Sequence, residues 1–254
     1  MHLLSVDWDF FQDVDASLLA SYPDGIDLPT YLTEVVWGTR YASDSRLLHV
    51  GCRVKEVAAM EALLRGLPKT TPVVVANSHA EAYNLAVRLA ARLADDKVFV
   101  VNADMHHDFQ NGNDALDCGN WIGKLMSDAN GVTADFRWIR NPVSLEMYGI
   151  SPDDEDEFAC LLAQKDGGTS LRPYIGKHFD AVFLARSDSW SPPHLDPHFD
   201  HLVKSLPSHF WYTDIAPCVA SPRKLYRKVM EETSKQYAEM QRALEKTTGR
   251  PRRG

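Results

Sequence analysis

The chain is poor in the features that mark secreted and membrane-spanning proteins. Its four cysteines in 254 residues show neither CxxC spacing nor the density of a disulfide scaffold, which favours reduced thiols in a cytosolic protein. No apolar run approaches the ~20 residues that a transmembrane helix needs, and the N-terminus lacks the basic and apolar regions of a signal peptide. We therefore expect a cytoplasmic protein with no membrane partner.

An excess of basic residues is also missing. Lys and Arg total 27 against 35 Asp and Glu, which gives a formal net charge of −8. This balance argues against a nucleic-acid partner and allows a cationic substrate. The sequence shows no internal repeat. Its length suits a single α/β domain over residues 1–254, and 44% hydrophobic residues are enough to bury a sizeable core.

Short apolar runs alternate with segments of helical periodicity. This alternation predicts right-handed crossovers and a mainly parallel sheet. The predicted elements are strands near residues 2–7, 72–76, 97–103, 135–140 and 180–186, and helices over 54–67 and 79–95.

Three segments fall outside this pattern. Residues 12–50 are the least regular and are expected either to fold over a site as a lid or to pack against an edge. Residues 222–246 predict a charged C-terminal helix. Residues 247–254 predict a disordered basic tail, to which we assign no function.

The most informative segment is residues 98–108, a buried apolar run that leads into Asp104, His106 and Asp108. Side chains of an extended chain repeat every second residue, so these three can project to one side where the strand ends. Mixed carboxylate and imidazole ligands suit a divalent cation such as manganese. The competing interpretation is a strand that simply ends in a polar loop.

Two other predicted strands end in comparable groups. The run 3–6 leads into Asp7 and Asp9, and the run 72–76 is followed by His79. Because parallel strands bring their carboxyl ends to one edge of a sheet, these groups are expected to meet in one crevice. Four carboxylates and two imidazoles are enough for two cations. The predicted metal ligands are Asp7, Asp9, His79, Asp104, His106 and Asp108.

The Asp-x-His-x-Asp unit at 104–108, with a separate strand-end histidine and a separate Asp-x-Asp, resembles the ureohydrolase superfamily of arginases and agmatinases. The resemblance implies a three-layer arginase/deacetylase-like α/β fold and two Mn²⁺ ions per chain. In arginases the Asp-x-Asp follows on a late strand, whereas Asp7 and Asp9 open this chain. A rearranged connectivity is therefore expected, with the first strand in the position of that late strand.

A closer resemblance rests on four segments together, at residues 5–9, 104–108, 118–121 and 186–193. It is to the arginase-like peptide arginases of bacterial ribosomal-peptide pathways. These convert arginine side chains of a precursor peptide into ornithine and release urea. The resemblance thus implies a precursor peptide containing arginine as the partner of this chain, with free arginine or agmatine as the rival substrates.

The resemblance also implies roles for individual residues. Asp108 would pass a proton from the attacking water to the leaving amine. His107 would assist catalysis or, alternatively, support the neighbouring ligand from outside the site. In the loop 118–123, Asn120 and Trp121 are candidate substrate contacts, with plain core packing as the alternative for Trp121.

A further set of polar groups follows the predicted strand at 180–186. Asp188 is a candidate anchor for a guanidinium, Trp190 could stack on it, and Arg186 belongs to the same rim. The alternative is a structural pair between Arg186 and Asp188.

Other classes remain open at this point. A phosphatase could use Asp7 as nucleophile and Asp9 as acid with Mg²⁺, although Phe11 stands where its motif wants Thr or Val. A deacetylase-like amide hydrolase would hold a single zinc. A non-catalytic binding protein could retain the same fold.

Overall fold

A computed structural model describes most of the chain. The described residues are 1–23, 27–94, 96–109, 115–127, 133–151, 156–206 and 212–214, with single positions at 223, 235, 239 and 242. The predicted C-terminal helix at 222–246, apart from those isolated positions, and the predicted tail at 247–254 lie outside the described residues.

Within the described residues every strand pair of the main sheet is parallel, and the strand order is β6-β5-β1-β7-β4-β8. The expectation of an α/β protein with a mainly parallel sheet is therefore confirmed. The three-residue edge strand β8 is too short for periodicity to identify it. The strands are β1 His2–Asp7, β4 Val73–Ala76, β5 Lys97–Asp104, β6 Thr133–Arg140, β7 Ala181–Ala185 and β8 Tyr212–Asp214.

Helices connect these strands, and two of them lie close to their predicted positions. The two that the sequence predicts are α3 and α4, which begin and end within about two residues of expectation. The helices are α1 Ala16–Leu19, α2 Thr30–Ser43, α3 Val54–Gly66, α4 Glu81–Leu93, α5 Trp121–Ser127, α6 Ser144–Met147, α7 Glu157–Lys165 and α8 Asp196–Lys204.

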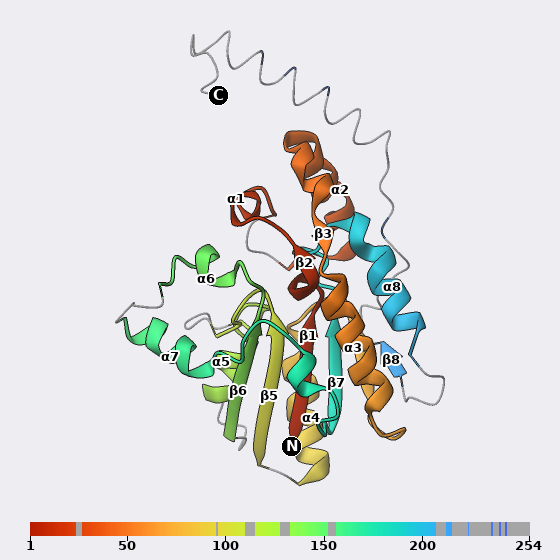
Figure 1. Ribbon diagram of the computed structural model, residues 1–254, viewed down its shortest axis with the longest axis vertical. Helices are drawn as coiled ribbons and strands as arrows, with labels where there is room; N and C mark the ends of the chain where they lie inside the picture. Colours follow the sequence, from red (N-terminus) through yellow and green to blue (C-terminus); the bar gives the residue numbers. More distant parts are fainter. Residues whose placement is uncertain are drawn as a thin grey trace.

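The sheet is covered on both faces because its strands are apolar on both. On β1, Leu4 packs into a core with residues of α3 and α8, whereas Leu3 packs into a second core with α4 and α5. Figure 1 shows α3 in front of the sheet and α4 behind it. Truncating the fully buried Leu4 to Ala would cost about 2–5 kcal/mol. Strands buried on both faces are typical of parallel sheets.

The segment 12–50, predicted to be the least regular, instead contains α2, which at 14 residues is longer than α3 or α4. It lies at the carboxyl ends of the strands, where Figure 1 shows α1 and α2. It is anchored by a two-residue antiparallel pair, β2 Gln12–Asp13 with β3 Gly51–Cys52. Its apolar side chains, among them Tyr22 and Trp37, form a third core together with Met105 and Leu195 from the loops after β5 and β7. The segment contacts the loop after β7 through the bonds of Thr30 and Trp37 to Asp188, and its role as a lid stays a prediction.

Two absences hold for the described part of the chain. No helix there is both long and apolar enough to cross a membrane. Among the described cysteines, Cys52, Cys118 and Cys160, no disulfide forms.

Candidate metal centre

Parallel pairing aligns the ends of the strands that carry the predicted ligands. The register of β1 with β5 brings Asp7 and Asp104 to matching positions where both strands end. On the other side of β1, Asp7 pairs with Ala185 of β7, which pairs in turn with Ala76 of β4, just before His79. Ligands that are far apart in sequence therefore meet at one edge of the sheet.

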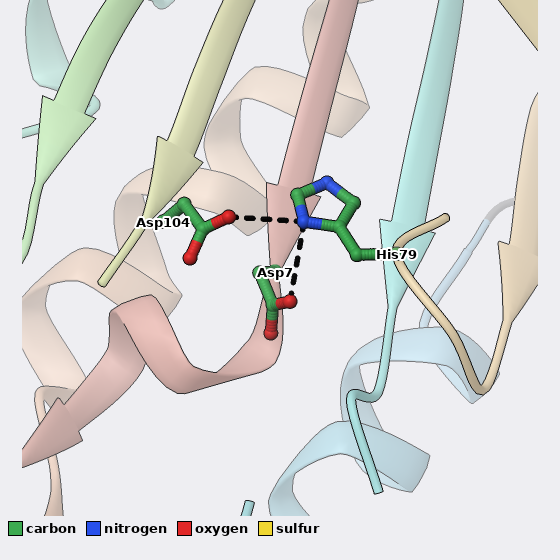
Figure 2. A group of neighbouring side chains, drawn as sticks. All are labelled: Asp7, His79 and Asp104. Carbon is green, nitrogen blue, oxygen red and sulfur yellow. Dashed lines mark ion pairs between the residues drawn. The ribbon is translucent and has the colours of Figure 1, made fainter. Parts of the chain in front are cut away.

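The first cluster, called here the His79 group, comprises Asp7, His79 and Asp104, whose ligand atoms all lie within 4.8 Å of one another. Nδ1 of His79 lies 2.9 Å from Oδ2 of Asp104 and 3.2 Å from Oδ2 of Asp7, as Figure 2 shows. Oδ2 of Asp108 lies 3.0 Å from the same nitrogen. All four side chains are buried, so three carboxylates face one imidazole nitrogen away from water.

The other ring nitrogen of His79 has a neutral partner. Nε2 lies 2.7 Å from the hydroxyl of Ser5, which is two residues before Asp7 on β1 and so on the same side of the strand. Nδ1, in contrast, has no hydrogen bond in the described part of the chain. A hydroxyl that holds one nitrogen while the other faces carboxylates is the arrangement that orients a metal-binding histidine.

The second cluster, called here the His106 group, comprises Asp9, Asp104 and His106. Nδ1 of His106 lies 2.9 Å from Oδ2 of Asp9 and 3.7 Å from Oδ1 of Asp104. Asp104 therefore presents Oδ2 to the His79 group and Oδ1 to the His106 group. A carboxylate shared in this way can bridge two neighbouring cations.

Local backbone geometry holds these carboxylates in place. A 3₁₀ turn, Trp8–Phe11, follows β1 directly, and Oδ1 of Asp7 accepts the N–H of Asp9 at its start. Oδ1 of Asp9 in turn accepts the N–H of Met105. Asp108 has a φ of +53°, a left-handed conformation that Asp tolerates better than most residues. The turn at Asp108 brings its carboxylate back to the His79 group.

The cluster carries more buried negative charge than its histidines can neutralise. Burial raises the pKa of Asp9, and the carboxylates of Asp7 and Asp104 raise it further. Burial and the charge of Asp104 raise the pKa of Asp108 as well. Burial would also raise the pKa of Asp104, but the contacts of Asp104 with His106 and His79 outweigh it and lower the value.

Burial acts in the opposite direction on the pKa of a histidine, because the charged form of histidine is the protonated one. Burial alone would lower the pKa of His79, but the charge of Asp108 and the contacts with Asp104 and Asp7 raise it. The carboxylates thus favour positive charge at this spot, and buried charges in proteins are normally paired or coordinate metals. These buried Asp and His side chains can therefore hold a metal ion.

The donor atoms are oxygen and imidazole nitrogen, which suit a cation such as Mn²⁺ more than a thiolate-seeking metal. The thiol of Cys118, which lines the adjoining cavity, has a pKa raised by burial and by the charges of Asp27 and Asp108. It therefore stays protonated, and a protonated thiol is a poor metal ligand.

A narrow cavity of about 120 Å³ opens onto the two groups. Trp190, which was expected at this rim, lies in its wall with its ring centroid 4.8 Å from that of His106. Asp27 and Asp117 also line the cavity, and the hydroxyl of Ser78 donates to Asp27. The complete lining is Asp7, Asp27, His106, Asp108, Asp117, Cys118, Gly119 and Trp190.

Asn120 and Trp121 lie behind the cavity. The indole N–H of Trp121 donates to Oδ2 of Asp108 across 2.6 Å, and Trp121 is fully buried. Asn120 donates to the carbonyl of Ala115 and accepts the N–H of Asp117. In the structure, Trp121 thus positions Asp108, and Asn120 holds the loop that carries Asp117.

Arg186 and Asp188 form an internal pair. Nε and Nη2 of Arg186 donate to the two oxygens of Asp188 across 2.5 and 3.0 Å, and Thr30 donates to Oδ2 of Asp188 across 2.6 Å. Both side chains are buried and neither lines the cavity. The geometry matches the structural-pair alternative and ties the segment 12–50 to the loop after β7.

His107 points to the opposite side of the chain from its neighbours. Its ring lies 4.6 Å from that of Tyr148 and 5.1 Å from that of Phe158, and Nδ1 accepts the N–H of Phe109. Burial and the charge of His106 lower the pKa of His107 to about 4. The structure therefore places His107 in an aromatic cluster as a neutral side chain that supports the ligand loop.

Sequence reasoning did not single out Asp27, Asp117 or Ser5. Ser5 carried a usable signal, because a polar residue in an apolar strand two positions before Asp7 must share its side. Asp27 carried none, because it lies in the segment 12–50, whose path depends on tertiary packing.

No protein-family model, curated protein or solved structure matches the chain. The site geometry is therefore the basis for functional inference.

Proposed function

We propose that this chain is a binuclear manganese hydrolase with an arginase/deacetylase-like fold. It would cleave the guanidinium group of arginine side chains, most readily within a peptide, to give ornithine and urea. The observation that carries the proposal is the pair of ligand groups that share Asp104, one of which contributes Asp7 and the other His106 to the wall of an acidic cavity. Asp7, Asp9, His79, Asp104, His106 and Asp108 would hold the two ions.

The charge of the cavity selects the substrate class. Four carboxylates, those of Asp7, Asp9, Asp104 and Asp108, offset the charge of two divalent cations. Asp27 lines the same cavity without belonging to either ligand group, and so does Asp117. Their residual negative charge favours a cationic group over the anionic phosphate of a phosphatase substrate or the neutral amide of a deacetylase substrate.

The size of the cavity fits a side chain. About 120 Å³ is well below the ~300–1,000 Å³ of sites that enclose a drug-sized ligand. An arginine side chain could enter with its guanidinium beside the ligand groups. Trp190 offers an aromatic face to the cation, and Asp27 offers a carboxylate that can accept its N–H groups.

Bound manganese would lower the pKa of a water molecule towards neutrality and so supply the nucleophile. Asp108 would accept a proton from the attacking water and transfer it to the leaving nitrogen, Nε of the substrate. Water oxygen bonds to Cζ and the Cζ–Nε bond breaks. The remaining proton of the new hydroxyl passes to the released amine, so the products are neutral urea and the ornithine ammonium group. Trp121 would hold the Asp108 carboxylate in position during this transfer.

The test combines metal content with urea release. After expression with manganese, about two Mn per chain and urea from N-acetyl-arginine amide would support the proposal. One zinc per chain with hydrolysis of an acetyl-lysine peptide would replace it with the deacetylase alternative. Phosphatase activity that needs Mg²⁺ would replace it with the phosphatase, and urea from free arginine or agmatine alone would remove the peptide from the proposal.

A further inference from the structure

A second and larger cavity, called here the flanking cavity, adjoins the first. It has a volume of about 520 Å³, and both His106 and Trp190 line it as well as the metal-facing cavity. These two side chains therefore form the partition between the cavities. The complete lining is Ala16, Ser17, Leu19, Ala20, Tyr22, Met105, His106, Glu146, Met147 and Trp190.

The flanking cavity has an apolar floor and an open rim. Met105 and Tyr22 are buried at its base, and Leu19 and Met147 are half-buried. Ala20, at the end of α1, is exposed at the rim. Small and apolar side chains from α1 and α6 thus face a space that solvent can enter.

The polar groups at the base of this wall bond within the protein. The Tyr22 hydroxyl donates to Oε1 of Gln12 across 2.5 Å, and Nε2 of Gln12 donates to the carbonyl of Trp190 across 2.8 Å. The hydroxyl of Ser144 donates to the carbonyl of Met105. These bonds fix the wall and the partition, and they leave the floor with little to offer a polar ligand.

We propose that the flanking cavity binds an apolar side chain next to the target arginine in a peptide substrate. This inference rests on the proposed function and narrows its substrate class. The two cavities share His106 and Trp190 as a common wall, so a peptide that crosses these two side chains can place one residue in each cavity. Free arginine carries charged groups at its backbone end and gains nothing from an apolar wall, whereas a neighbouring leucine buries its side chain there.

The experiment compares two peptides on the manganese-loaded protein, acetyl-Leu-Arg-Leu-amide and acetyl-Gly-Arg-Gly-amide. Both kcat/KM for urea release and affinity by calorimetry are measured. We expect the leucine peptide to be favoured by about ten-fold or more, since burying a leucine side chain contributes about that much. Ala20→Phe, which fills the rim, should collapse this preference.

Ala91→Phe is the matched control, because Ala91 is an exposed position on α4, remote from both cavities. It should keep the leucine preference. Equal kcat/KM and equal affinity for the two peptides would overturn the inference, as would an unchanged preference in Ala20→Phe. A third outcome separates the two proposals: neither peptide releases urea, but the leucine peptide binds more tightly and Ala20→Phe removes that difference. This outcome would refute the proposed reaction and support binding of an apolar side chain in the flanking cavity.

Discussion

The indole N–H of Trp121 donates to Oδ2 of Asp108 across 2.6 Å. The same oxygen lies 3.0 Å from Nδ1 of His79, so one carboxylate oxygen joins the loop after β5, the helix α5 and the loop after β4. A residue that sequence reasoning treated as either core or substrate contact thus orients a group proposed to move the proton.

Trp121→Phe should lower kcat by about ten-fold or more with little change in KM or manganese content. The reason is that a hydrogen bond to a charged group contributes about 1.5–3 kcal/mol, and its loss frees the Asp108 carboxylate to rotate. Steady-state urea release and metal analysis would check this. Trp37→Phe removes a buried indole bond to the carbonyl of Asp188 instead and should keep kcat. A similar loss of kcat in both variants would argue against a positioning role for Trp121.

Asp104→Asn should lose both metal ions, because Asp104 belongs to both ligand groups, whereas Asp9→Asn should retain about one ion per chain. Urea release should fall to background in Asp104→Asn. Metal content by plasma mass spectrometry decides the outcome, and circular dichroism checks that each variant folds. Full activity in folded Asp104→Asn would refute the metal-site assignment.

Asp27→Asn should stabilise the metal-free protein at pH 7–8. Burial raises the pKa of Asp27 to about 6, above its unfolded value of 3.8. The protonated form therefore contributes stability that is fully present below pH 3.8 and is lost as the pH rises through about 6. A neutral Asn should gain about 3 kcal/mol over wild type near pH 8 and close to nothing below about pH 4. Urea unfolding at both pH values measures the difference, and a pH-independent gain would contradict the charge explanation.

The same Asp27→Asn substitution should weaken the binding of cationic substrates. If the Asp27 carboxylate contacts the guanidinium, KM for N-acetyl-arginine amide should rise by about ten-fold with manganese content unchanged. Asp200→Asn removes one negative charge on α8, where Asp200 pairs with Lys204, and should leave KM unchanged. An equal rise of KM in both variants would point to net charge instead of a specific contact.

Local pattern was enough to predict most of the sheet. The five strands carry apolar runs between turn-forming segments, and α3 and α4 carry a clear helical stripe. The meeting of Asp7, His79 and Asp104 was also predictable, because parallel strands end at one edge whatever their order in the sequence. Alternation even separates His107 from its neighbours, since odd and even positions of an extended chain face opposite sides.

The sequence by itself thus determined five strands of the main sheet, the helices α3 and α4 and the set of residues at the strand ends, because these depend on periods of two and 3.6 residues. Only the tertiary structure decided that Arg186 turns inward to Asp188, that Asp27 enters the cavity wall and that Trp121 holds Asp108. Those outcomes depend on how the loops pack at the ends of the strands: Arg186 and Asp188 are only two residues apart, yet Thr30 from another segment completes their pair. No local period encodes which buried partner a polar side chain meets when the chain folds.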